Sequence, residues 1–136
     1  MISAFDISTS GLIAQRARLD AIASNLANVS SMRNEEGELK PFQARYVIFE
    51  TDESMKTKHG AVGVRVAEVK TEDREPVIRN QPGHPLADKN GNVAYPDINM
   101  TREFVDALVA TRAYEANIGV IEATKNMGQQ TLRIIA

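Results

Sequence analysis

An apolar residue recurs at every seventh position near the start of the chain. The row consists of Phe5, Leu12, Leu19 and Leu26. Because an α-helix completes a turn in about 3.6 residues, this row forms one narrow stripe along a helix, with Ile22 at the half-heptad position beside it. The pattern predicts a helix from Phe5 to about Val29. Ser3 and Asp6 predict a capping box at its start.

A second, longer helix is predicted at the other end of the chain. It begins after Pro96, capped by Asn99 or Asp97, and runs to about Ile134 without an internal proline. Two heptad rows follow it, with Leu108 widening the stripe. The first row is Phe104, Thr111, Ile118 and Leu132, and the second is Ala107, Tyr114, Ile121 and Ile135.

Glycine and proline concentrate between these helices, and the helical period disappears there. Short strands are predicted at residues 45–49, 62–66 and 77–78, and a hairpin over residues 86–95 around Asn90-Gly91. The sequence therefore predicts an α+β fold. Long helices in residues 1–30 and 99–136 pair as an antiparallel coiled coil, and a small β-rich segment, residues 31–98, is inserted between them.

Two apolar positions per heptad bury only a narrow strip, so each helix needs a partner helix. The obvious partner is the other terminal helix, yet the two differ in length by roughly 15 Å at about 1.5 Å per residue. Part of the longer helix would stay uncovered in a single molecule. Uncovered apolar surface is normally an interaction site, but core helices of a monomeric domain show the same spacing. The spacing alone leaves both interpretations open.

Composition excludes several classes of function. The chain has no cysteine, so it forms no disulfide, thiolate metal site or cysteine nucleophile. Its 16 lysines and arginines are scattered without a basic patch, so we expect no nucleic-acid partner. Apolar runs are far shorter than the ~20 residues of a membrane helix, so we expect no direct membrane insertion. The first residues have none of the features of a cleaved secretory signal.

Candidate ligand sites are weak. Residues 88–92, Asp-Lys-Asn-Gly-Asn, resemble the start of a calcium loop, but an EF-hand needs glycine at Val93 and glutamate at Asn99. A turn at these residues is favoured instead. His59 and His84 have no neighbouring ligand at metal spacing. With no nucleophile, phosphate loop or carboxylate pair standing out, we expect no enzyme, no cofactor and no metal.

Four motifs resemble those of a known family. They are Ala-Ser-Asn-Leu-Ala-Asn at 23–28, Pro-Gly-His-Pro-Leu-Ala-Asp at 82–88, Gly-Asn-Val-Ala-Tyr-Pro-Asp-Ile-Asn at 91–99 and Thr-Arg-Ala-Tyr-Glu-Ala-Asn at 111–117. Together they resemble the flagellar basal-body rod proteins, and the small proximal-rod type in particular, over essentially the whole chain. The ending Leu132 to Ala136 and the loop from Arg33 to Lys40 depart from that pattern.

The resemblance implies a structural subunit that polymerises through its terminal helices and transmits torque from the motor to the distal rod and hook. Its implied partners are copies of itself, other proximal and distal rod proteins, and the adaptor between the rod and the membrane ring. The implied location is the periplasmic rod of the basal body. Export would use the flagellar type III apparatus, without a cleaved signal. The alternative function is a small soluble helical adaptor or chaperone, which would show the same helices.

Two sets of residues are predicted to make contacts. The coiled-coil seam and subunit interface comprise Phe5, Leu12, Leu19, Ile22, Leu26, Phe104, Leu108, Ile118, Ile121 and Leu132. Polar contacts near the junction of helix and β segment are assigned, from the family motifs, to Asn25, Asn28, Arg112, Tyr114 and Asn117.

Overall fold

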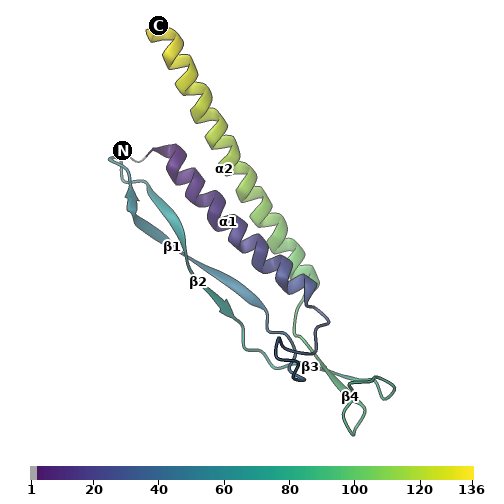
Figure 1. Ribbon diagram of the computed structural model, residues 1–136. Coiled ribbons are helices and arrows are strands. Elements are labelled where there is room, and N and C mark those ends of the chain that lie inside the picture. The colour runs from purple at the N-terminus through teal and green to yellow at the C-terminus, as the bar shows by residue number, and fades with distance from the viewer. Residues whose placement is uncertain (1–2) are drawn as a thin grey trace.

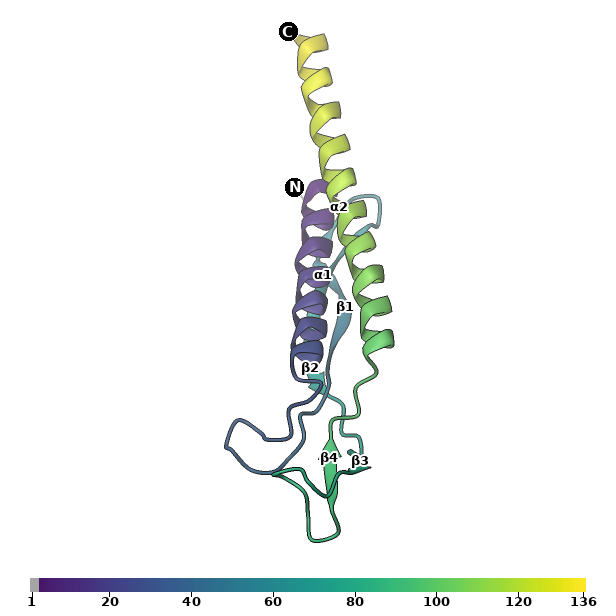
Figure 2. The ribbon, with the colours of Figure 1, turned by 90° about the vertical axis from the view of Figure 1, so that its right-hand side faces the viewer.

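A computed structural model describes residues 3–136 of the chain. Helix α1 (Ala4–Ala27) and helix α2 (Met100–Ile135) lie side by side and antiparallel (Figures 1 and 2). Between them in sequence come β1 (Arg45–Lys56), β2 (Val62–Thr71), β3 (Val77–Asn80) and β4 (Asn92–Tyr95). The predicted α+β fold, with paired terminal helices and a small inserted β segment, is confirmed.

The helices begin and end where their capping residues place them. At the start of α1, the Ser3 backbone N–H donates to Asp6 Oδ2 at 2.8 Å, and the Asp6 N–H donates to Ser3 Oγ at 3.4 Å. The hydrogen bond from the Ser3 backbone is the main cause that lowers the pKa of Asp6. At the other end, Asn28 Nδ2 donates to the Ser24 carbonyl at 2.8 Å. The predicted capping box is confirmed, and so is Asn99 as the N-cap of α2.

Small side chains bring the two helices together. A Cβ added at Gly11 would lie 2.9 Å from the side-chain amide of Asn117. Ala14 is 1% exposed and Ala110 is 0% exposed. Because α2 packs on α1 and on no other described helix or strand, α1 must be what covers Ala110. Glycine and alanine at a contact let helix backbones approach closely, and here they hold α1 against α2.

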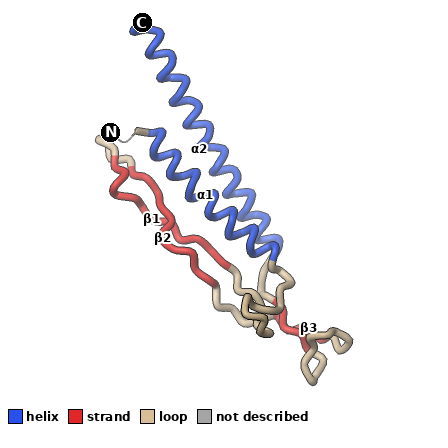
Figure 3. Tube along the Cα trace, viewed as in Figure 1, coloured by secondary structure: helices blue, strands red, loops and turns tan. Residues whose placement is uncertain are grey.

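The hairpin of β1 and β2 covers the other side of α1. The strands are antiparallel, and Arg45 pairs with Thr71 at the end near the helix junction. Ser10 Oγ of α1 accepts a hydrogen bond from the Val64 N–H of β2 at 3.1 Å. The hairpin packs on α1 and leaves α2 uncovered, so the strands gather on one side of the helix pair (Figure 3). Helix α1 is thus enclosed between α2 and the hairpin.

The second pair of strands corrects one prediction. The hairpin predicted over residues 86–95 is wrong, because β4 pairs with β3 in the register Val77–Tyr95 to Asn80–Asn92. The predicted turn at Asn90-Gly91 does form, with Gly91 at φ +77. Asp88 Oδ1 accepts hydrogen bonds from the N–H groups of Asn90 and Asn92, both at 2.8 Å. This local bonding closes a loop inside the longer connection of residues 81–91.

Within residues 3–136, neither helix is long and apolar enough to cross a membrane.

The close contact at Gly11 generates a stability prediction. Gly11→Leu should lower the free energy of unfolding by about 1–3 kcal/mol, because the new side chain has to displace Asn117 or separate the helices. Urea unfolding followed by far-UV circular dichroism measures the change. Gly119→Leu is the matched control, since a Cβ at Gly119 of α2 meets nothing within 4 Å. An equal loss in both variants would contradict close packing at Gly11.

Candidate functional site: the helix pair and its polar junction

The leucine row of α1 lies on the side of the helix pair that the hairpin leaves open. Gly11, Arg18 and Asn25 each contact α2, through Asn117, Asp106 and Glu103 respectively. Ser10, one position before Gly11, contacts the hairpin. Each residue turns the helix by about 100°, so Leu12, Leu19 and Leu26, one position after the contacts, point away from the hairpin. All three are half-buried.

Helix α2 presents its own apolar residues on the same side. Phe104 and Ile118 each follow a residue that contacts α1, namely Glu103 and Asn117. On the opposite side of α2, Asp106 and Val120 line depressions shared with the hairpin. The exposed fractions are 57% for Phe104, 37% for Ile118 and 60% for Leu108. Leu108 lies two positions, about 200°, before the buried Ala110, so it points away from α1 and continues the row beside Phe104. We call the surface formed by these residues the open face, comprising Leu12, Leu19, Leu26, Phe104, Leu108 and Ile118.

The other predicted seam residues lie around this face. Ile22 is buried, at 6% exposure, and Ile121 is half-buried on the side of α2 that meets α1. Phe5 is 45% exposed near the start of α1. Leu132 is 68% exposed, on the part of α2 that extends past α1. Whether these residues form subunit contacts stays a prediction.

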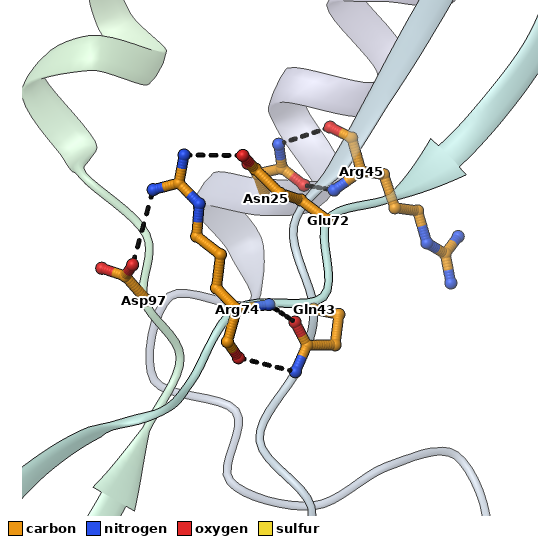
Figure 4. A network of polar contacts seen from close by, with 6 residues as sticks. All are labelled: Asn25, Gln43, Arg45, Glu72, Arg74 and Asp97. Atoms are coloured by element: carbon orange, nitrogen blue, oxygen red, sulfur yellow. Dashed lines mark hydrogen bonds and ion pairs between the residues drawn. The ribbon is translucent and has the colours of Figure 1, made fainter.

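A single buried amide joins α1, α2 and the hairpin. Asn25, which is 2% exposed, donates from Nδ2 to the Arg45 carbonyl at 2.8 Å and accepts from the Arg45 N–H at 2.7 Å. The same Nδ2 donates to Glu103 Oε2 of α2 at 3.1 Å. Figure 4 shows the two bonds that Asn25 makes to the Arg45 backbone. The start of β1 is therefore fixed to both helices at one point.

Arg74 joins the segments that enter and leave the β region. Its backbone N–H donates to Gln43 Oε1 at 3.1 Å, and Gln43 Nε2 donates back to the Arg74 carbonyl at 3.3 Å. Its guanidinium bonds Glu72 at 2.6 Å and Asp97 at 3.4 Å (Figure 4). The hydrogen bond to Glu72 is the largest cause that raises the pKa of Arg74. This polar junction ties the chain before β1, after β2 and before α2.

The residues predicted to make polar contacts do not all lie at this junction. Asn25 and Asn28 do. Arg112 pairs with Glu115 at 3.1 Å on the exposed side of α2, and Tyr114 is half-buried. Asn117 bonds the Ala113 carbonyl at 2.9 Å and faces Gly11. These three lie midway along α2.

Sequence reasoning missed most of the junction. The junction includes side chains from three separate segments of the chain, namely Gln43, Arg45, Glu72, Arg74 and Asp97. Asp97 lies in the family motif of residues 91–99, where it was considered as a cap of the helix and not as a partner of Arg74. Only the pair of asparagines in the last turns of α1, which is unusual for a helix, gave a signal.

The surface of the subunit has several depressions. One of about 930 Å³ lies between the first turns of α1 and the tip of the hairpin, lined by Ile7, Val120, Lys56, Lys58 and His59 among others, with no carboxylate. Within residues 3–136, no group of three or more histidine, aspartate and glutamate side chains is placed to hold a metal ion.

Comparisons with known proteins match both ends of the chain. A family model described as flagella basal body rod protein matches residues 5–31, which include nearly all of α1. Another, described as flagellar basal body rod FlgEFG protein C-terminal, matches residues 89–134, which include β4 and nearly all of α2.

Curated relatives match over nearly the full length. The flagellar basal-body rod protein FlgC of Salmonella typhimurium is 38% identical over 134 residues, which cover 98% of this chain and 97% of that protein. The FlgC protein of Yersinia enterocolitica is 37% identical with the same coverage. That of Borreliella burgdorferi is 34% identical, covering 99% of this chain and 97% of that protein.

The buried amide of Asn25 predicts a pH-dependent variant. Asn25→Asp should cost about 2–4 kcal/mol at pH 7, because the Arg45 carbonyl loses its donor and a buried charge faces Glu103. Burial and Glu103 raise the pKa of the new carboxyl, so the cost should shrink as pH falls through that pKa and the group can donate again.

Urea unfolding of variant and parent at pH 7 and pH 4.5 measures this difference. Asn80→Asp, on exposed β3, is the matched control and should change stability by less than about 0.5 kcal/mol. A cost for Asn25→Asp as small as the control's would show that this amide does not hold the junction.

Proposed function

The chain belongs to the FlgC family of flagellar basal-body rod proteins, and we propose that it polymerises into the proximal rod through its open face. As a member of this family it is a structural subunit of the flagellar basal-body rod, which assembles with copies of itself and with other rod proteins. The observation that supports the open face is the run of apolar side chains that neither the hairpin nor the other helix covers, with Phe104 57% and Leu108 60% exposed.

The physical reason is the free energy of burying these side chains. Removing a leucine or phenylalanine from water contributes roughly 1.5–3 kcal/mol. The hairpin packs on α1 alone, and the open face has no other described helix or strand against it. A second copy supplies that cover. Because the rows extend along both helices, each contact is modest and rigidity comes from its repetition in the polymer.

The polar junction gives this subunit a mechanical role. Asn25 and Arg74 fix the hairpin to the helix pair through several hydrogen bonds. Force on the helices therefore reaches the β segment, and the subunit transmits torque toward the distal rod and hook. In this proposal residues 1–30 and 99–136 form the assembling core, and residues 31–98 the insertion. The protein has no catalytic role.

The same proposal places the subunit in the periplasmic part of the basal body. Its neighbours there are proximal and distal rod proteins and the adaptor to the membrane ring. It reaches that place unfolded through the flagellar type III apparatus. A small helical adaptor, the alternative considered from sequence, does not fit the family to which the chain belongs.

An exposed position of the open face provides the main test. Leu108→Asp should leave the unfolding free energy within about 0.5 kcal/mol, because the side chain faces water in the single subunit. It should nevertheless abolish swimming in cells whose only copy of the protein carries it, since the charge would be buried on assembly. Soft-agar motility and electron microscopy of basal bodies measure this effect.

Ile13→Asp is the matched control, because Ile13 is an equally exposed apolar residue of α1, at 64%, outside the open face. Cells carrying it should swim. If cells with Leu108→Asp swim, or if both variants lose motility equally, the open face is not the surface through which the subunits assemble.

Leu19→Asp tests the α1 half of the same face. Leu19 is half-buried, so this variant should lower stability as well as prevent rod assembly. Unfolding measurements on the purified chain separate the two effects. Normal swimming of cells with Leu19→Asp would count against a role of the leucine row in assembly.

A further inference from the structure

Asn90 differs from the other asparagines of the chain in its surroundings. Of the nine asparagines, it alone is followed by glycine. Its side chain is exposed, and within residues 3–136 it forms hydrogen bonds only through its backbone. The Asn90 N–H donates to Asp88 Oδ1 at 2.8 Å, and the Asn90 carbonyl accepts from Asn80 Nδ2 at 3.4 Å. The carbon of the side-chain amide is therefore open to attack.

The group that can attack this carbon is the backbone nitrogen of Gly91. Glycine has no Cβ, so its nitrogen is less shielded than that of any other residue. In the structure the Gly91 N–H donates to the Asp88 carbonyl at 3.0 Å, and Gly91 has φ +77. This nitrogen therefore has to leave Asp88 before it can reach the side chain of Asn90.

The turn that holds the nitrogen depends mainly on Asp88. Its carbonyl accepts from Gly91, and its Oδ1 accepts from the N–H groups of Asn90 and Asn92. Residues 88–90 are exposed, and the loop that contains them stands clear of both helices (Figure 1). Exposed loops with few buried apolar contacts open at a low cost in free energy. The hydrogen bonds of Asp88 thus determine how often the turn opens.

We propose that Asn90 is a site of spontaneous deamidation and that Asp88 sets its rate. The Gly91 nitrogen bonds to the side-chain carbon of Asn90 and gives up its proton, and the side-chain nitrogen leaves as ammonia. The five-membered succinimide ring that results takes up one water, which breaks one of the two bonds from the ring nitrogen to a carbonyl carbon. Breaking the bond to the side-chain carbon leaves aspartate. Breaking the bond to the backbone carbon leaves isoaspartate.

Either product weakens the end of the β3–β4 pair. Both add a carboxylate close to Asp88, and like charges repel. Isoaspartate also adds a methylene to the backbone before Gly91. Gly91 lies against Pro82, where an added Cβ would be 3.1 Å away, and its carbonyl accepts from the Gln81 N–H at 2.7 Å. A longer backbone shifts Gly91 relative to both residues, so deamidation loosens this loop.

Mass spectrometry of the purified full chain tests the site. The chain is incubated at pH 8 and 37 °C in water enriched in oxygen-18, and cleavage after arginine in ordinary water then yields the peptide of residues 80–102. Asn80, Asn92 and Asn99 in this peptide precede residues other than glycine and are internal controls. Fragment ions should place the heavy oxygen at residue 90 and at none of the controls. If residue 90 stays unlabelled over a time in which the chain unfolded in guanidinium chloride reacts, the proposal is overturned.

Asp88→Ala tests the control of the rate. The variant loses side-chain hydrogen bonds of the turn, and the loss of one bond of ordinary net strength raises the open population by about fivefold. The rate at Asn90 should rise by about that factor in the folded chain and stay the same in the unfolded chain. Asp73→Ala, at an equally exposed aspartate between β2 and β3, is the matched control and should change neither rate. Equal rates in the folded parent and the folded Asp88→Ala variant would overturn the role of Asp88.

Discussion

The close contact of α1 and α2 through small side chains determines where the large ones go. Gly11, Ala14 and Ala110 fill the space between the helices, so little room is left there for leucine or phenylalanine. The large apolar residues of both helices therefore point sideways. A hairpin covers one side of α1 and nothing in the described part of the chain covers the other. A subunit built in this way is complete as a fold while much of its apolar surface stays available to neighbours.

This packing also explains how far sequence could predict the fold. Heptad spacing, Ser3 and Asn99 gave both helices nearly to the residue, because capping and periodicity are local properties. Heptad spacing does not show which neighbouring element covers an apolar stripe. Alanine and glycine are also too small to stand out in a pattern of large apolar residues. The contact between the helices through Gly11 was therefore not predicted. The leucine row was predicted, but it lies beside this contact and not within it.

The β segment marks the limit of local reasoning. The turn at Asn90-Gly91 was predicted because the asparagine-glycine dipeptide favours the positive φ that such turns require, and Gly91 adopts it. The pairing of β4 with β3 was not predicted. Eleven residues separate the two strands, and they form a loop with its own hydrogen bonds. Asn25 was singled out because asparagine is rare inside a helix, whereas Arg74 depends on side chains from segments far apart in the sequence.

The one-sided position of the hairpin has a consequence for the shape of any polymer of this chain. The strands lie against α1 and not against α2, so the two long sides of the helix pair differ (Figure 3). Copies that join through the bare side keep their hairpins on the opposite side. A layer of such copies then has one surface of strands and one of helices.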